Sequence, residues 1–141
     1  MRAFRSIAAA AALVLVGSGC PLAPGEREER LGIIQVLPGF PAQVGVPGSA
    51  AVGEPFVVSV LTHAGRCLRA GPTQVRRDGM TAEVRPYDLY LSGSDCTSDA
   101  AYHQHIATLW FDQPGTATVH FTGVGNPGGQ ILTVTRTVTI E

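Results

Sequence analysis

The feature that most constrains the fold is a regular alternation of apolar residues in several segments of the chain. Apolar residues recur at every second position in 55–62, 116–122 and 130–141. Successive side chains of a β-strand point to opposite faces, so this period of two predicts strands with one buried face. After the first thirty residues, no ten-residue stretch has a convincing period of 3.6 residues. The sequence therefore predicts an all-β domain with almost no helix.

Turn-forming residues separate these segments. The chain contains 17 Gly and 10 Pro together with many Val and Thr, a composition typical of short strands joined by tight turns. Asp78-Gly79 lies between two further strand-like segments and predicts a hairpin with a type I′ turn, in which both central residues have a positive φ. Pro47-Gly48 interrupts another segment, which favours an edge strand there. The remaining predicted strands are 31–37, 44–52, 87–91 and 103–111.

About seven to nine short strands in roughly 110 residues predict a two-sheet β-sandwich. Val-Gly-Glu-Pro-Phe-Val-Val-Ser-Val at 52–60 and Phe-Asp-Gln-Pro-Gly-Thr-Ala-Thr-Val at 111–119 precede a long C-terminal strand rich in Thr and Val. Together these segments resemble the bacterial immunoglobulin-like domains of exported proteins, over most of 31–141. The resemblance implies that 52–60 contains strand B, that the Pro-Gly turn joins strands E and F, and that the last segment is strand G. It implies a fold and no particular activity.

The resemblance also implies where two cysteines lie. Cys67 follows strand B, and Cys96 lies in a polar turn before strand E. The BC, DE and FG turns share one end of such a sandwich, so a disulfide between Cys67 and Cys96 is consistent with this topology. It would tie the BC turn to the DE turn, unlike the central bridge between strands B and F of antibody domains. Its closed loop of about thirty residues corresponds to roughly 3 to 4 kcal/mol in chain-entropy estimates.

The first twenty residues predict export. Arg2 and Arg5 precede an apolar run, Ile7 to Val16. As a helix this run is about 15 Å long at ~1.5 Å per residue, about half of the hydrocarbon layer of a membrane. It is therefore expected to be a signal peptide and not a permanent span.

The end of this signal resembles that of bacterial lipoproteins, because Gly17-Ser18-Gly19 precedes Cys20. The resemblance implies that residues 1–19 are removed and that Cys20 receives a diacylglycerol. The family usually has an aliphatic residue three positions before the cysteine, where this chain has Gly17, and ordinary secretion with a nearby cut is the alternative. Lipidation of Cys20 would leave an even number of cysteines to pair.

Residues 20–30 are expected to form a lipidated tether and 31–141 the folded domain. The segment after Cys20 has Pro and Gly followed by a charged run, which is typical of a solvated linker; the alternative for 26–30 is a solvated approach to the first strand. The domain and tether have eight Arg, no Lys and eleven acidic residues, a formal charge of 8 − 11 = −3. Nucleic-acid binding is disfavoured by this charge. The expected location is the bacterial cell envelope, at the outer membrane or the cell surface, with the lipid as the contact to the membrane.

Histidines give the only candidate metal site in the sequence. His103 and His105 are two residues apart and would point to the same side of a strand, and His63 is expected near the same end of the sandwich. Three imidazoles with Asp95 or Asp99 as an oxygen ligand would suit zinc or copper. Exposed histidines at the rim of a strand and a loop are the alternative, and no cofactor is predicted.

Two other groups of residues invite a binding role. Arg66, Arg69, Arg76 and Arg77 cluster in the sequence and would suit a phosphate or carboxylate, or simply supply the basic surface of a chain without lysine. Trp110 and the three tyrosines, Tyr87, Tyr90 and Tyr102, would suit a sugar or a peptide, or would pack at the rim of the core. Trp110 is expected to face outward if Leu109 and Phe111 face the core.

Motifs of catalysis are absent from the sequence. It has no Gly-x-Ser-x-Gly and no phosphate-binding loop, and its glycine-rich stretch 123–129 leads into a strand instead of a helix. The favoured function is therefore a non-enzymatic, lipid-anchored module that contacts an envelope protein or a small ligand through the BC, DE and FG turns or through a sheet edge. The alternative is a small metal or ligand carrier that uses His63, His103 and His105.

Overall fold

The computed structural model describes residues 27–65, 67–91 and 100–141, and every regular element in them is a strand. The strands are β1 (Arg27–Leu31), β2 (Ile33–Gln35), β3 (Val44–Gly45), β4 (Ser49–Ala50), β5 (Phe56–Gly65), β6 (Leu68–Asp78), β7 (Thr81–Leu91), β8 (Ala100–Leu109), β9 (Gly115–Asn126) and β10 (Ile131–Ile140). The described part of the chain contains no helix, and so none that could span a membrane. The prediction of an all-β fold is confirmed.

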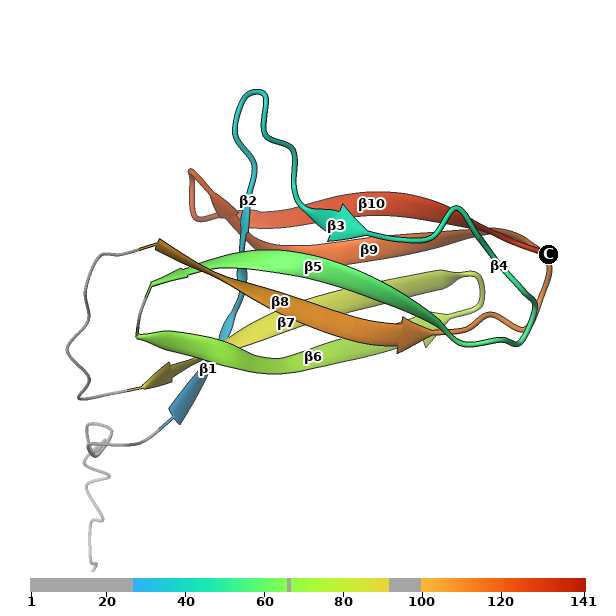
Figure 1. Cartoon of the computed structure of the whole chain (residues 1–141), viewed down its shortest axis with the longest axis horizontal. Coiled ribbons are helices and arrows are strands. Elements are labelled where there is room, and N and C mark those ends of the chain that lie inside the picture. Colours follow the sequence, from blue (N-terminus) through green and yellow to red (C-terminus); the bar gives the residue numbers. More distant parts are fainter. Residues whose placement is uncertain (1–26, 66, 92–99) are drawn as a thin grey trace, which may run out of the picture.

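The ten strands form one curled sheet (Figure 1). Three long antiparallel ladders dominate it: β5 with β8, β6 with β7, and β9 with β10. The short strand β2 hydrogen-bonds both to β5 and to β9, and β7 lies parallel to β9. Because β2 connects the two sides, the separation into two sheets of an immunoglobulin-like sandwich is not confirmed.

The N-terminal strands differ from the expectation. The single strand expected at 31–37 is two strands, β1 and β2, separated at Gly32. At Gly32 a side chain would clash, because a Cβ there would lie 2.5 Å from Cγ2 of Thr62. Residues 27–30, expected in the tether, belong to β1 and pair with β7, so the strand begins earlier than the sequence suggested.

The interruption at Pro47-Gly48 has the expected effect on the edge strand. Before it, β3 pairs with β5, and after it, β4 pairs with β10. The backbone thus changes its neighbouring strand at the residue pair that breaks the ladder. Proline has no N–H to donate, which suits such a crossing point.

The predicted hairpin is present as β6 and β7, but its turn is of another type. Asp78 pairs with Thr81, so Gly79 and Met80 are the central residues. Gly79 has a φ of +55°, and no described residue other than glycine has a positive φ. Positive φ at the first central residue alone is the pattern of a type II′ turn, so the prediction of a type I′ turn was wrong.

The hydrophobic core fills the interior of the curled sheet and follows the alternation seen in the sequence. Its buried members on the three long ladders include Val58, Val60, Val84, Ala107, Leu109, Val119, Phe121, Val138 and Ile140. Phe111 adds a buried ring 6.0 Å from the ring of Phe56. Along β5 and β8 the core is apolar where β5 begins and becomes polar towards the end of β5.

The strand directions agree with one shared end for the predicted BC, DE and FG turns. β5, β7 and β9 all finish at the end where β6, β8 and β10 start, which is the left side of Figure 1. Cys67 is buried directly before β6. Cys96 and Cys20 lie outside the described residues, as do the signal peptide and residues 20–26 of the tether, so the disulfide and the lipidation stay predictions.

Candidate functional site

Two histidines and an aspartate form a buried cluster on the inner side of the β5–β8 ladder. Asp88 of β7 is 1% exposed, and its Oδ1 accepts hydrogen bonds from His103 Nδ1 at 2.7 Å and from His105 Nε2 at 3.2 Å. Thr62 of β5 lies 3.1 Å from the same Nε2 atom, and Thr73 of β6 lies 3.4 Å from Nδ1 of His105. We call these five residues the His–Asp cluster. His103 and His105 point to one side, as predicted; His105 is buried and His103 is partly buried, so neither is fully exposed at a rim.

The pKa of Asp88 is set by two opposed effects. Burial raises the pKa of this carboxyl, and hydrogen bonds from His105, His103 and Thr62 together lower it by more, so that the pKa is below the ordinary value of 3.8. Oδ2 is buried without a hydrogen-bond partner among the described residues. It lies against Gly32, where a Cβ would be 3.3 Å from it.

The arrangement of the cluster can be compared with those of catalytic triads and of metal sites. His105 lies between Thr73 and Asp88, the order of a hydroxyl, base and acid triad, but no cavity described below is lined by Thr73. His63 lies on the other side of β5, edge-on to the ring of Tyr102 at 5.4 Å. Within residues 27–65, 67–91 and 100–141, no group of three or more His, Cys, Asp or Glu could hold a metal ion. Asp95 and Asp99 lie outside these residues.

The outer side of the same ladder exposes large apolar side chains and carries no acidic residue and no arginine. The outward side chains are Val57, Ser59, Leu61 and His63 of β5 and Tyr102, Gln104, Ile106 and Thr108 of β8, and we call them the uncharged face. Val57, Ile106 and Tyr102 are 58%, 56% and 54% exposed. None of the eight is a carboxylate or a guanidinium, although the chain contains 21 such residues. Exposed large apolar side chains gathered on one face mark an interaction surface.

A groove continues this face beneath the loop between β2 and β3, which projects from the sheet in Figure 1. A two-residue turn shapes the loop: Leu37 and Phe40 exchange backbone hydrogen bonds of 3.0 and 2.8 Å, and Gly39 has a φ of +80°. Phe40 is 72% exposed. The groove has a volume of about 270 Å³ and is lined by Gln35, Leu37, Phe40, Pro41, Gln43, Leu61, His63 and Tyr102. Sequence reasoning did not identify this loop, although Phe40 between two prolines in a non-strand segment was a signal.

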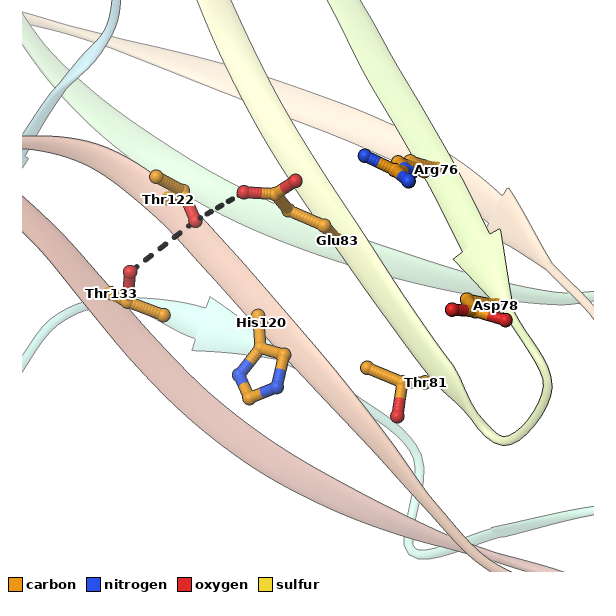
Figure 2. Close-up of a pocket in the computed structure, with 7 residues that line it drawn as sticks. All are labelled: Arg76, Asp78, Thr81, Glu83, His120, Thr122 and Thr133. Atoms are coloured by element: carbon orange, nitrogen blue, oxygen red, sulfur yellow. Dashed lines mark hydrogen bonds between the residues drawn. The ribbon is translucent and has the colours of Figure 1, made fainter.

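A second hollow, on the outer side of β6, β7, β9 and β10, has the opposite chemistry (Figure 2). Its volume is about 380 Å³, and its lining residues are Arg76, Asp78, Thr81, Glu83, His120, Thr122 and Thr133. Glu83 accepts hydrogen bonds from Thr122 at 3.0 Å and from Arg85 at 2.9 Å. The bond from Arg85 is the main cause of the lowered pKa of Glu83. The charge of Glu83 is thus already paired within the protein.

The predicted arginine and aromatic sites do not assemble. Arg77 stacks on Trp110 at 3.7 Å and donates a hydrogen bond to its carbonyl, whereas Arg76 lines the polar hollow. Trp110 faces outward as expected, with Leu109 and Phe111 buried beside it in the sequence. Trp110 directly follows β8 and is eight residues from Tyr102 of that strand, about 26 Å at ~3.3 Å per residue. Arg66 lies outside the described residues. The ring of Tyr90 is covered by Arg30 at 4.1 Å.

Comparison with protein-family models, with curated proteins and with solved structures finds no match to this chain. The geometry of the faces described above therefore carries the functional argument.

Proposed function

We propose that this chain is a non-enzymatic contact module of the bacterial envelope that binds a protein through the uncharged face and the adjoining groove. The observation that carries the proposal is the combination of exposure and lack of charge on β5 and β8. The apolar side chains of Val57 and Ile106 are exposed to water, and only a bound molecule would remove this surface from water. Phe40 and Tyr102 add large, partly rigid side chains of the kind that dominate binding energy at protein interfaces.

The contact surface in this proposal is a sheet face, and not the turns or the sheet edge favoured by the sequence alone. A face is the better candidate because its side chains are held in register by an uninterrupted ladder from Phe56 and Leu109 to Gly65 and Ala100. Such side chains lose little freedom when they are covered, since the ladder has already ordered their backbone.

The membrane part of the proposal is the lipid on Cys20, supported by the signal that precedes it in the sequence. An anchor would confine the module to the plane of the membrane and raise its effective concentration towards other envelope proteins. Replacement of Cys20 by Ser in the full chain is expected to release the protein from membranes or to block its processing. Unchanged fractionation and migration of this variant would contradict the anchor.

Photocrosslinking in the native host tests the contact surface. A photoreactive phenylalanine analogue at Ile106 is expected to yield a protein adduct, because this position is at the centre of the uncharged face. The matched control is the same analogue at Thr81, in the polar hollow of Figure 2. Equal adduct yields from both positions, or none from Ile106, would contradict the proposal.

The alternative of a metal or ligand carrier receives less support from the geometry. His103 and His105 converge on Asp88, while His63 points away from them. The described residues do not bring the three histidines together around one point.

A further inference from the structure

One edge of the curled sheet is long, regular and mostly unoccupied. On one side β10 pairs with β9 over its whole length without a bulge. On its other side it pairs only with the short strand β4, at Thr139 and Ile140 near the C-terminal end of β10 (Figure 1). Among the described residues, no strand pairs with 131–138 on that side. We call this part of β10 the free edge.

The hydrogen bonds to the segment around β4 show which backbone groups face the free edge. Thr139 N donates to the carbonyl O of Gly48 at 3.0 Å. Glu141 N donates in the same way to Ala50, also at 3.0 Å. The odd-numbered residues of β10 thus direct their N–H and C=O groups away from β9, because successive residues of a strand alternate between its two neighbours. The odd-numbered residues within the free edge that remain unpaired are Thr133, Thr135 and Thr137.

Three other edge strands of the sheet are obstructed in ways that the free edge is not. β6 has an irregularity between Ala70 and Thr73, with Pro72 inside it. β3 and β4 are each two residues long. Proteins protect sheet edges with such bulges, prolines and short strands, because an unprotected edge pairs readily with another chain. The free edge contains neither proline nor glycine and keeps a regular register with β9.

Arg136 is the one charged residue on the free edge. Its guanidinium donates a hydrogen bond of 2.9 Å to the carbonyl O of Thr135, which is one of the groups that face the edge. Arg136 is exposed and forms no ion pair with the part of the chain that the structure describes. A single charge on an edge disfavours indiscriminate pairing. It would favour a strand that brings a carboxylate to this position, since such a pair is a strong charge-assisted hydrogen bond.

The side chains of the free edge impose a pattern on any strand added beside it. Leu132 and Val134 are half-buried and pack against the hydrophobic core. The threonines between and after them are exposed on the outer side of the sheet. An added strand would extend both faces of the sheet, so its residues would alternate between apolar and polar ones.

We propose that the free edge binds an extended segment of a partner protein, which adds to the sheet as a further strand beside β10 and brings an acidic residue to Arg136. An extended backbone offers donors and acceptors at intervals of two residues, ~6.7 Å, which is the spacing of the unpaired groups of the three threonines. The chain uses the end of this edge in the same way: β4 pairs with it, and the backbone leaves it at Pro47-Gly48. This site is separate from the uncharged face and goes beyond the proposed function.

A phage-displayed library of random ten-residue peptides, selected against the purified full-length protein, tests the proposal. The selected peptides are expected to alternate between apolar and polar residues and to contain Asp or Glu. Thr135→Pro removes an N–H that faces the free edge and leaves the ladder with β9 complete, so peptide binding is expected to weaken about tenfold or more. Thr135→Val is the matched control, because it keeps the N–H; binding is expected to stay within about twofold.

Arg136→Glu is a second variant, which changes the charge and keeps every backbone donor. It is expected to weaken binding of the acidic peptides about tenfold. Replacement of the acidic residue of the peptide by Lys is expected to restore binding to this variant. The test therefore does not depend on the stability of Thr135→Pro.

Methylation of the peptide's backbone nitrogens gives a readout that is specific for strand addition. Only alternate N–H groups of an added strand face β10, so methylation at one set of alternate positions should abolish binding and at the other set should leave it within about twofold. Loss with both sets or with neither would overturn the proposal. Selection of no peptide, or of peptides whose binding both variants leave unchanged, would also overturn it. Photocrosslinking from Ile106 is independent of these results, so its failure would contradict the proposed function alone.

Discussion

Each side of the β5–β8 ladder carries some residues that burial alone would place on the other side. On the inner side, towards the end of β5, several buried residues are polar: Thr62 and His105, together with Asp88 from β7. On the outer side, large apolar residues are exposed, Val57 and Ile106 among them. A monomer selected for stability alone would favour the reverse, since burying a polar group costs free energy and exposing an apolar one forfeits it.

The difference separates two kinds of constraint. The inner polar groups are tolerated because they satisfy one another: one oxygen of Asp88 accepts from two imidazoles. Buried hydrogen-bonded groups of this kind restrict the geometry in which strands can meet. The outer apolar groups have no such internal reason, and the partner contact proposed above would supply one.

The largest effect is expected from removing the charge at the centre of the inner side. Asp88→Asn is expected to lower the free energy of unfolding by roughly 3 kcal/mol, because the amide replaces a buried charged acceptor that two imidazoles share. Urea unfolding of the purified protein measures the loss. A change below about 1 kcal/mol would show that the His–Asp cluster contributes little to the fold.

Acid is expected to remove the same contribution without a mutation. Asp88 has a lower pKa in the folded chain than its ordinary 3.8, so the unfolded chain takes up the proton first as the pH falls. The stabilisation from Asp88 is complete above the unfolded pKa and is lost as the pH falls through the folded pKa. In urea unfolding, the difference between the unmodified protein and Asp88→Asn should therefore shrink below about pH 4. A constant difference down to about pH 2.5 would contradict the lowered pKa.

An added methyl group behind the cluster is expected to have an intermediate effect. In Gly32→Ala the new Cβ would meet Thr62 at 2.5 Å and the unpartnered Oδ2 of Asp88 at 3.3 Å. Overpacking of this kind typically costs about 1 to 3 kcal/mol. Gly48→Ala is the control, because nothing lies within 4 Å of a Cβ there. Equal thermal stability of the two variants would show that β2 can move away from the cluster.

The smallest effect is expected on the outer side, and adjacent valines provide the matched test. Val58→Thr places a hydroxyl in the core, at a position 1% exposed, and should cost about 1 to 3 kcal/mol. Val57→Thr makes the same substitution on the uncharged face and should change the free energy of unfolding of the monomer by less than about 0.5 kcal/mol. Comparable losses in urea unfolding would mean that the outer side is already packed against something within the chain.

Much of the inner side could be read from the sequence. The alternation that includes Val58 and Val60 continues to Thr62. The alternation that includes Ala82 and Val84 continues to Asp88. The period of two therefore predicts that both polar residues face inward. Only the apolar members of each series entered the predicted core. A carboxylate at an inward position of a strand was therefore an available signal of a buried polar cluster.

The choice of strand neighbours was outside the reach of the sequence. Nothing in 33–35 indicates that β2 joins β5 to β9, or that β7 lies parallel to β9. Local alternation states which residues share a face and does not state which strand lies next to which. Likewise, the Asp78-Gly79 pair located a hairpin, while the register of β6 on β7 decided which residues occupy its turn.

The sequence by itself determined that the described chain folds as strands, roughly where the long ones lie, and which side of them is buried, because these properties depend on residues close together along the chain. Only the tertiary structure brought Asp88 to His103 and His105, separated His63 from them, and gathered Val57 and Ile106 on one exposed face. These relations join residues on different strands. They follow from the pairing of the strands, which is set by the packing of the whole core and not by any one segment.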